Sequence, residues 1–568
     1  MEYSHITFVS AFIIPPKLGF YINIDTYIYN FKLLASSGMS ICLFASSSLE
    51  SHIVKIQNEF PNVKIIGLIN YEDLWTTQLI SNINTISLPT ITNPDKDTHE
   101  YMNIMNFKLP LLKHTVELNP FNSTHFSWID FGILKLSRTL GTVLPRLSVL
   151  ASNNIILHKK FLFIPGGMPK CQRVDDLLNG VYWRFFGGFL IGDGESILDF
   201  ANLSEKYYKK FIETYSTNVW EVNIWAWMEM LEVISPSTLL SSFSDDMLLL
   251  PSEYYTIVPI SKMDLSTRTQ HNQYRGFFGT DFHPSSSAFI RYNDKNILNT
   301  RYINYWIRPS GYFTIENARN YIVSKNAMFE LDSEFNPISC KEVSEENLPL
   351  QDIQYLCYQG IEDCRLFEYN HKVCFIGTNY DRISTGKLRI VMGTYETNPP
   401  SFQNFQILEP PIDTNCEKNW VPFIKGDNLY FIYQWYPFCI GSLHGSQLNI
   451  IYEQQMNPIF EHIRGSSLLV KNSLNTRICV VHYCEYQPFG KKTYMHRLLE
   501  VEETAQLVRP IRYSKPFCFD TTGIEYCIGF YINQGRYCFW VSIKDRNPTF
   551  ITIPITSIEL ENIPLIFA

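Results

Sequence analysis

The sequence lacks the segments that carry proteins into or across a membrane. Its 568 residues contain no run of about 18 apolar residues, so no transmembrane helix is expected. The apolar stretch from Ile6 to Ile14 follows no positively charged segment and ends at Pro15-Pro16, which does not fit a secretory signal. We therefore expect a cytoplasmic protein.

Clusters of basic residues are also missing. Lys and Arg total 47 against 55 Asp and Glu, which gives a formal net charge of -8, and no run of Lys and Arg is longer than a pair. Proteins that follow a phosphate backbone usually carry a basic stripe. Nucleic acid is therefore not an expected partner.

Cysteines are present without the short spacing that a zinc site needs. None of the 13 cysteines forms a C-x-x-C pair. We expect buried free thiols in a reducing compartment. The abundance of Ile, Asn and Tyr suggests an AT-rich genome, such as that of a large DNA virus.

The first 260 residues alternate short apolar runs with amphipathic stretches, which is typical of an α/β domain. The predicted strands are Ile6–Ile13, Ser40–Ala45, Val63–Leu68, Phe126–Asp130 and Gly188–Gly192. The predicted helices are Asp25–Ala35, Leu49–Glu59, one long helix over Glu100–Glu117, Ser196–Tyr215 and Val219–Val233.

The pattern changes after about residue 260, where strand–turn–strand units replace helical periodicity. One unit runs from Ala288 through a turn at Asn293-Asp294 to Tyr302. Closure into a propeller would protect the edges of so many strands, and the remaining length fits about five blades of about 50–60 residues. Residues 261–568 are therefore predicted to form a five-bladed β-propeller, with a pair of β-sandwiches as the alternative.

A carboxylate follows the predicted strand in Trp128-Ile-Asp-Phe-Gly132. Ligands of α/β sheets bind outside the carboxyl ends of strands, where Asp130 can hold a divalent metal against a diphosphate. Gly132 would let the backbone approach such a ligand closely. The alternative is that Asp130 only caps the next helix.

Together with Asn119-Pro-Phe121 and Lys108, this run resembles the HtrL/YibB family of GT-A-like glycosyltransferases, over about residues 5–250. The resemblance implies a nucleotide-sugar donor, a glycan acceptor and a metal, Mn²⁺, bound by Asp130. It also implies a donor-phosphate contact from Lys108, with Lys113 as the alternative.

Other segments of this half fit the same resemblance. Phe8–Phe12 looks like the first strand that enters a nucleotide-sugar pocket, with Ser10 and Ala11 at its end. The glycine pair Gly187-Gly188 looks like the segment that lines the acceptor side of the donor. The remaining candidates are Glu221 as the catalytic carboxylate, Glu213 and Glu229 as its alternatives, and Asp245 or Asp246 as a second metal ligand.

The second half carries a different set of motifs. Gly360-Ile-Glu-Asp-Cys-Arg-Leu366 resembles the G-x-E-D-P-R motif of five-bladed propeller mannoside phosphorylases and related mannosyltransferases, with Cys364 in place of proline. Segments that resemble their later blades follow in the same order, at Lys418–Phe423, Phe431–Pro437, Arg464–Ser467, Ser514–Phe517, Gly523–Tyr526 and Val541–Asp545.

This resemblance implies a sugar site around Asp363, which would act as a general acid. Glu362 and Arg365 would bind sugar hydroxyls, unless they form an ion pair that only stabilises the sheet. Phosphorolysis would also need several cations around the phosphate, for which the candidates are Lys418, Arg464 and His482. Trp420, Trp435 and Tyr483 are the candidates for stacking on sugar rings.

The sequence thus predicts a glycosyltransferase, metal-dependent and bifunctional, with a second sugar-active site in the propeller. One alternative is a single active α/β domain with a propeller that only binds glycans. Another is a propeller that acts as a glycoside phosphorylase, and the last is a non-catalytic interaction protein.

Overall fold

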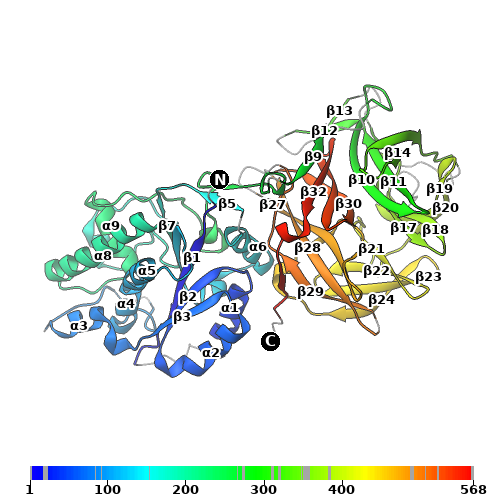
Figure 1. Ribbon diagram of the computed structural model, residues 1–568. Helices are drawn as coiled ribbons and strands as arrows, with labels where there is room; N and C mark the ends of the chain where they lie inside the picture. Colours follow the sequence, from blue (N-terminus) through cyan, green and yellow to red (C-terminus); the bar gives the residue numbers. More distant parts are fainter. Residues whose placement is uncertain are drawn as a thin grey trace. The chain divides into compact units, whose positions relative to one another are not determined.

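The computed structural model describes most of the chain, which divides into two compact units (Figure 1). The described residues are 3–16, 23–83, 85–90, 93–152, 154–264, 266–271, 276–308, 313–316, 321–346, 348, 358–380, 386–486, 492–505, 507–520 and 523–564. The units comprise Met1–Thr256 and Ile257–Leu565. No helix in the described part of the chain is long and apolar enough to cross a membrane, and the cysteines described there are free thiols.

The first unit is built on a six-stranded sheet of order β3-β2-β1-β4-β7-β6. Its strands are β1 (Ile6–Phe12), β2 (Ser40–Ala45), β3 (Val63–Leu68), β4 (His125–Ile129), β6 (Leu162–Phe163) and β7 (Phe189–Asp193). The pairs β1–β2, β2–β3 and β1–β4 are parallel, whereas β7 is antiparallel to both β4 and β6. Because β1 and β4 are parallel neighbours, their carboxyl ends lie at the same edge of the sheet.

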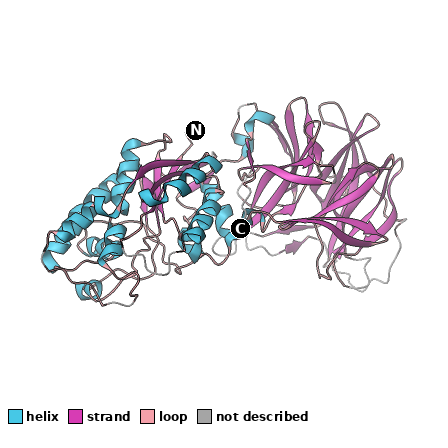
Figure 2. Cartoon of the chain, turned by 90° about the horizontal axis from the view of Figure 1, so that it is seen from below, coloured by secondary structure: helices cyan, strands magenta, loops and turns pink. Residues whose placement is uncertain are grey.

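Helices surround this sheet, as Figure 2 shows. They include α1 (Ile24–Ala35), α2 (Glu50–Glu59), α3 (Trp75–Ser81), α6 (Leu140–Leu150), α7 (Val174–Leu178), α8 (Gly194–Tyr215) and α9 (Glu221–Met230). The buried core joins strand residues such as Val9 and Trp128 to the apolar faces of α8 and α9, for example Phe200 and Trp225. The prediction of an α/β unit is confirmed.

The prediction of one long helix over Glu100–Glu117 is wrong, because the structure has two helices there. These are α4 (His99–Asn106) and α5 (Lys108–Leu118), which meet at Phe107. Pro110 explains the break: proline has no backbone N–H and its ring clashes in a helix interior, but it fits the first turn of a new helix. As a result, Lys108 is the first residue of α5.

The second unit contains five sheets of four or more strands, and these are the blades of a propeller. The first sheet joins β10 (His283–Tyr292), β11 (Lys295–Ile303), β14 (Ile322–Leu331) and β15 (Pro337–Glu342). The second joins β17 (Glu362–Tyr369), β18 (Lys372–Asn379), β19 (Arg389–Thr397) and β20 (Pro400–Leu408). The third joins β21 (Val421–Lys425), β22 (Asn428–Trp435), β23 (Phe438–His444) and β24 (Gln447–Gln454).

The last two sheets complete the ring. The fourth contains β25 (Arg464–Gly465), β27 (Thr476–Tyr486), β28 (Lys492–Glu503), β29 (Val508–Ser514) and β33 (Leu560–Asn562). The fifth contains β30 (Glu525–Asn533), β31 (Arg536–Ile543), β32 (Asn547–Pro554) and β9 (Arg268–His271). Strand β9 precedes the first blade in the chain but pairs with β32 of the last, so the ring is closed by both ends of the unit.

The five-bladed propeller prediction is therefore confirmed, and the sandwich alternative is wrong. The hairpin turn predicted at Asn293-Asp294 lies between β10 and β11. Its two residues have positive φ values of 47° and 60°, as the two central residues of a tight hairpin turn require.

Candidate functional site

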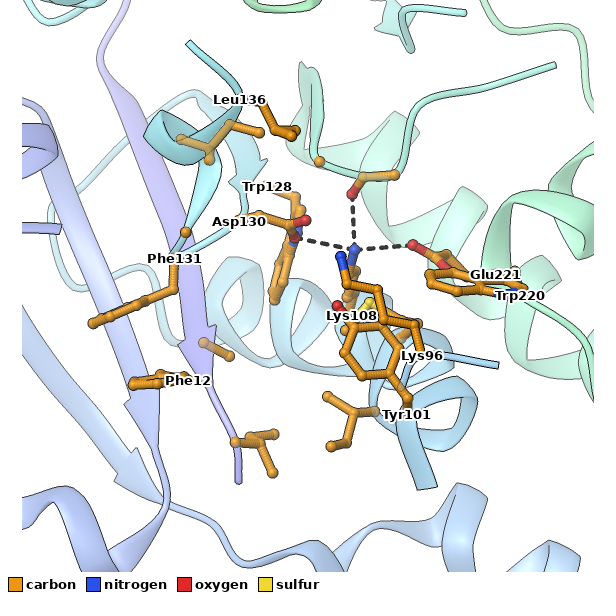
Figure 3. Close-up of a pocket in the computed structure, with 18 of the residues that line it drawn as sticks. Phe12, Lys96, Tyr101, Lys108, Trp128, Asp130, Phe131, Leu136, Trp220 and Glu221 are labelled. Atoms are coloured by element: carbon orange, nitrogen blue, oxygen red, sulfur yellow. Dashed lines mark hydrogen bonds and ion pairs between the residues drawn. The ribbon is translucent and has the colours of Figure 1, made fainter. Parts of the chain in front are cut away.

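The first unit has a cavity of about 460 Å³ at the carboxyl ends of β1 and β4 (Figure 3). Ala11 and Phe12 from β1 and Asp130, directly after β4, line it. The opposite walls come from the loop that precedes α4, from α4 and α5, from the Gly187-Gly188 segment and from the start of α9. This is where α/β sheets bind their ligands.

Lys108 lies at the centre of this cavity wall. Its ammonium donates to Glu221 Oε1 at 2.9 Å and to the carbonyl oxygen of Gly187 at 3.0 Å, and lies 3.0 Å from Asp130 Oδ1. Figure 3 shows the ammonium between the two carboxylates. The motif residues Lys108, Asp130 and Glu221, which come from three separate elements, are thus brought together.

The charges of this group compensate one another in part, because two carboxylates share one ammonium group. Burial by itself lowers the pKa of Lys108, but the negative charges of Asp130 and Glu221 outweigh burial, so the net result is a raised pKa. Glu221 is 3% exposed, and its Oε2 has no hydrogen-bond partner among the described residues. A buried acceptor of this kind is costly unless a ligand or a water donates to it.

Asp130 is the more accessible of the two carboxylates, with 35% of its side chain exposed. Its Oδ1 also accepts a hydrogen bond from Trp128 Nε1 at 2.7 Å, so only Oδ2 remains open. The described residues contain no group of three or more His, Cys, Asp or Glu side chains that could hold a metal. The donor set therefore does not fit a metal that the protein holds by itself, and the role of Asp130 as an Mn²⁺ ligand stays a prediction.

Most of the predicted donor-site residues line the cavity, namely Ala11, Lys108, Asp130, Gly132, Gly187, Gly188 and Glu221. Ser10 does not, because its side chain is fully buried behind the cavity wall. At Gly187, a Cβ atom would lie 2.1 Å from Glu221 Oε1. Glycine is required there so that the carboxylate can reach Lys108.

The alternatives named from the sequence lie elsewhere. Lys113 donates to Asn202 on α8, and Glu213 is exposed on the same helix. Glu229 forms a two-point ion pair with Arg184, in which both N···O distances are 2.6 Å. Of the two lysine candidates, Lys108 therefore faces the cavity, and of the three glutamate candidates, Glu221 does.

Asp245 and Asp246 are not placed to be second metal ligands, because neither lines the cavity. Asp245 accepts from the backbone N–H groups of Arg138 and Thr139 at 2.9 and 3.1 Å. Asp246 accepts from the Ser242 hydroxyl at 3.0 Å. Asp245 therefore joins its segment to the start of α6, whereas Asp246 stabilises a local turn.

One family model matches part of the chain. The model of HtrL_YibB, described as a bacterial protein of unknown function, matches residues 19–221. The matched residues include Lys108, Asp130 and Glu221, but they make up less than half of the chain. No curated protein matches the sequence. The GT-A-like character of this unit stays a prediction.

The propeller has a polar cavity of its own, with a volume of about 510 Å³. Several blades contribute to it, since its charged or ionisable lining residues are Arg301, Tyr305, Glu362, Asp363, Lys418, Arg464, His482, Lys492, Tyr494, Tyr526 and Asp545. Strand β17 begins at Glu362, so the predicted acidic pair lies at the start of a strand.

The acidic pair is held by a cation from another blade. Arg301 on β11 lies 3.1 Å from Glu362 Oε1 and 3.3 Å from Asp363 Oδ1, and Lys418 Nζ lies 3.8 Å from Glu362 Oε2. Asp363 has a positive φ of 48°, which turns its side chain out of the regular strand alternation. Ser286 also donates to Asp363, at 3.3 Å.

A third carboxylate, Asp545, lies in the same cavity and was missed as a site residue. It accepts from Tyr305 at 2.5 Å and from Ser285 at 3.0 Å. Burial raises the pKa of the Asp545 carboxyl, and the positive charge of Arg301 opposes this rise.

Arg365 is not a sugar ligand in this structure, and it does not pair with Glu362. Its guanidinium is buried and donates to the carbonyl oxygen of Ser466, to Asn419 at 3.2 Å and to Tyr526 at 2.7 Å. The register of β17 against β18 shifts between Glu362 and Arg365, so the two side chains do not follow simple strand alternation. Arg365 ties blades together beneath the cavity wall.

The prediction that Trp420, Trp435 and Tyr483 stack on sugar rings is also wrong. Trp420, Trp435 and Tyr483 are at most 3% exposed and do not line the cavity. Trp420 packs between blades with Phe431 and donates its indole N–H to Glu417 at 2.9 Å. The aromatic residues that do line the cavity are Tyr305, Phe313, Tyr358, Tyr380, Tyr494 and Tyr526.

The cation set is larger than the sequence indicated. Lys418, Arg464 and His482 all line the cavity, and Arg301 and Lys492 join them. Burial lowers the pKa of His482 well below its usual value, and the charges of His496 and Arg464 act in the same direction. The imidazole is therefore neutral near pH 7.

Solved structures that resemble the chain come from sugar-active proteins, at low similarity. A β-1,2-mannobiose phosphorylase from Listeria innocua has 10% identity and a TM-score of 0.33, over 51% of this chain and 97% of that one. A mannose phosphorylase from Leishmania mexicana has 11% identity and a TM-score of 0.34, over 53% of this chain and 93% of that one. A GDP-Man-dependent mannosyltransferase from the same organism has 13% identity and a TM-score of 0.32, over 52% of this chain and 94% of that one. At these values the similarity does not establish an activity for this chain.

Proposed function

We propose that this protein is a glycosyltransferase whose α/β unit binds a nucleotide-sugar donor and transfers the sugar to a glycan acceptor. The observation that carries the proposal is the Lys108–Asp130–Glu221 group in a cavity at the carboxyl ends of parallel strands. The cavity walls also carry large aromatic surfaces, including Tyr101 and Trp220, against which a base or a sugar ring can pack.

The two carboxylates suit the chemistry of transfer. Glu221 Oε2, buried without a partner, can accept a hydrogen bond from a sugar hydroxyl. In the reaction, the acceptor hydroxyl oxygen forms the new bond to the anomeric carbon while the bond from that carbon to the diphosphate breaks. Asp130 Oδ2 is open to the cavity and can take the proton that the acceptor hydroxyl loses.

The propeller cavity supports a second sugar-active site in the same proposal. Asp363 and Asp545 are its candidate acids, and Glu362 is held by Arg301 and Lys418. A second candidate function for this cavity is phosphorolysis. The number of cationic side chains that line it favours that function, because phosphate binding needs several charged donors.

A ligand panel on the full-length chain tests the proposal. We expect at least one nucleotide sugar to raise the melting temperature, since a ligand at 100 times its Kd adds about 2.7 kcal/mol. The same compound should be hydrolysed slowly without acceptor, and Asp130→Asn should abolish this hydrolysis. Asp363→Asn should leave the hydrolysis of the nucleotide sugar unchanged but should remove activity toward oligosaccharides. The absence of any stabilising nucleotide sugar would contradict the proposal and favour an interaction protein.

A further inference from the structure

Two lysines that no motif singled out face the α/β cavity. Lys96, in the loop that precedes α4, and Lys135, in the short helix after Asp130, both line it. Lys135 Nζ lies 3.2 Å from the centre of the Tyr27 ring, and Lys96 Nζ lies 5.8 Å from the centre of the Tyr101 ring. Both rings belong to the cavity wall, so cation–π contacts hold the two ammonium groups at its surface.

These two ammonium groups have no carboxylate partner among the described residues. Burial lowers the pKa of Lys135, and the positive charge of Lys96 lowers it further. The lysine pair therefore presents two ammonium groups to the cavity that no described carboxylate contacts.

The acidic groups that face the cavity already have partners of their own. Asp130 and Glu221 share Lys108. Asp97 accepts from Trp220 Nε1 at 3.1 Å and from the backbone N–H of Asn93 at 2.7 Å. An anion beside the lysine pair would thus meet two ammonium groups that are not held in an ion pair with any of these carboxylates.

Lys108 itself is not free for an anion. An ammonium has three donors, and the three oxygens of Asp130, Glu221 and Gly187 take them. The donor-phosphate contact expected from Lys108 therefore needs another residue. Lys96 and Lys135 are the cations that remain in the cavity lining.

We propose that Lys96 and Lys135 bind the diphosphate of the donor and that this binding does not require Mn²⁺. The inference rests on the proposed function, in which the donor is a nucleotide sugar. Each phosphate of such a donor carries one negative charge, and the two ammonium groups match them. Asp130 offers one open oxygen to a divalent cation, whereas the two ammonium groups can neutralise the diphosphate without a divalent cation.

Isothermal titration calorimetry on the full-length chain tests the proposal, with UDP and GDP as probes and uridine and guanosine as phosphate-free controls. In EDTA, we expect one of the two diphosphates to bind the parent protein. Lys96→Met and Lys135→Met should each weaken that binding about tenfold or more, because each removes a charge-assisted hydrogen bond to a phosphate. Affinity for the matching nucleoside should not change.

Three further variants make the test specific. Lys55→Met, at an exposed lysine of α2 outside the cavity, should bind the diphosphate like the parent. Lys96→Arg and Lys135→Arg keep the charge and should retain most of the affinity. Both lysines are exposed, so we expect all variants to melt like the parent.

The possible outcomes separate this inference from the proposed function. Equal diphosphate affinity in the parent and in both methionine variants overturns the inference and leaves the proposed function standing. Binding that appears only when Mn²⁺ is added also overturns the inference alone. If neither diphosphate binds the parent under any condition, both the inference and the nucleotide-sugar function are overturned.

Discussion

Lys108 and Glu221 form an ion pair at 2.9 Å in which each side chain is only 4% exposed. The two residues lie 113 positions apart in the sequence. A buried pair of this kind contributes little net stability, yet loss of one partner leaves an uncompensated charge in the protein. The pair therefore fixes the position of the Glu221 carboxylate more than it stabilises the fold.

The first prediction follows from this pair. Lys108→Met removes the cation and leaves Glu221 charged and buried, so the free energy of unfolding should fall by about 3–5 kcal/mol. Urea unfolding of the full-length chain measures the change. The double variant with Glu221→Gln removes the stranded charge and should recover a large part of the loss. If the single variant were as stable as the parent, the buried-pair geometry would be wrong.

The second prediction concerns Asp130. Because its Oδ2 is open to the cavity while Oδ1 holds Lys108, Asp130→Asn should lower sugar transfer or nucleotide-sugar hydrolysis by about 100-fold or more. The melting temperature should stay within a few degrees, since the amide keeps the shape of the side chain. Glu213→Gln on the exposed face of α8 is the matched control. Retained activity in Asp130→Asn would exclude the assigned role.

The sequence was most informative where the signal is local. The apolar runs Ser40–Ala45 and Val63–Leu68 match β2 and β3 residue for residue, because strands of a parallel sheet form short apolar runs between turns. Asp130 was found in the same way, as a carboxylate placed directly after such a block. The prediction of one long helix over Glu100–Glu117 is wrong because the apolar spacing continues through Pro110, where the backbone starts a new helix.

Contacts between distant segments could not be read from the sequence. Arg301 pairs with Glu362 across two blades, and nothing in the local sequence of either residue indicates this. Trp420 was predicted to face a sugar, but burial between blades depends on the packing of the whole ring. Lys96 lies in a loop and Lys135 in a short helix, and neither belongs to a motif, so the shared cavity is what identifies them.

The third prediction concerns pH. Burial lowers the pKa of His496 to about 3, whereas an unfolded histidine titrates near 6.5. Below about pH 6.5 the unfolded state binds a proton that the folded state does not, so the stability of the propeller should fall as the pH falls. Between pH 7 and pH 5, this one histidine should lower the free energy of unfolding by about 2 kcal/mol. His482, whose pKa is also lowered by burial, acts in the same direction.

Urea unfolding at pH 7 and pH 5 measures this effect, and one substitution isolates it. His496 packs against Phe519, with ring centroids 4.6 Å apart, so His496→Phe preserves an aromatic core and removes the titrating group. The pH dependence should then be smaller by about 2 kcal/mol. His462→Phe, at an exposed histidine of the same unit, should leave the pH dependence unchanged. An unchanged pH dependence in His496→Phe would mean that His496 is protonated in the folded state.

The last prediction separates a sugar site from a structural ion pair in the propeller. Asp363 lies 3.3 Å from both Arg301 and Ser286, and its φ of 48° is one that asparagine also tolerates. Asp363→Asn therefore keeps the backbone and the shape of the side chain while it replaces the ionisable carboxyl with a neutral amide. We expect activity toward oligosaccharides to fall by about 100-fold or more, with a melting temperature within a few degrees of the parent. Asp427→Asn, in the exposed turn between β21 and β22, should behave like the parent in both measurements. Unchanged oligosaccharide activity together with a large drop in melting temperature would show that Asp363 serves only to hold Arg301, because a neutral amide would then leave that buried guanidinium with Glu362 as its one remaining carboxylate partner.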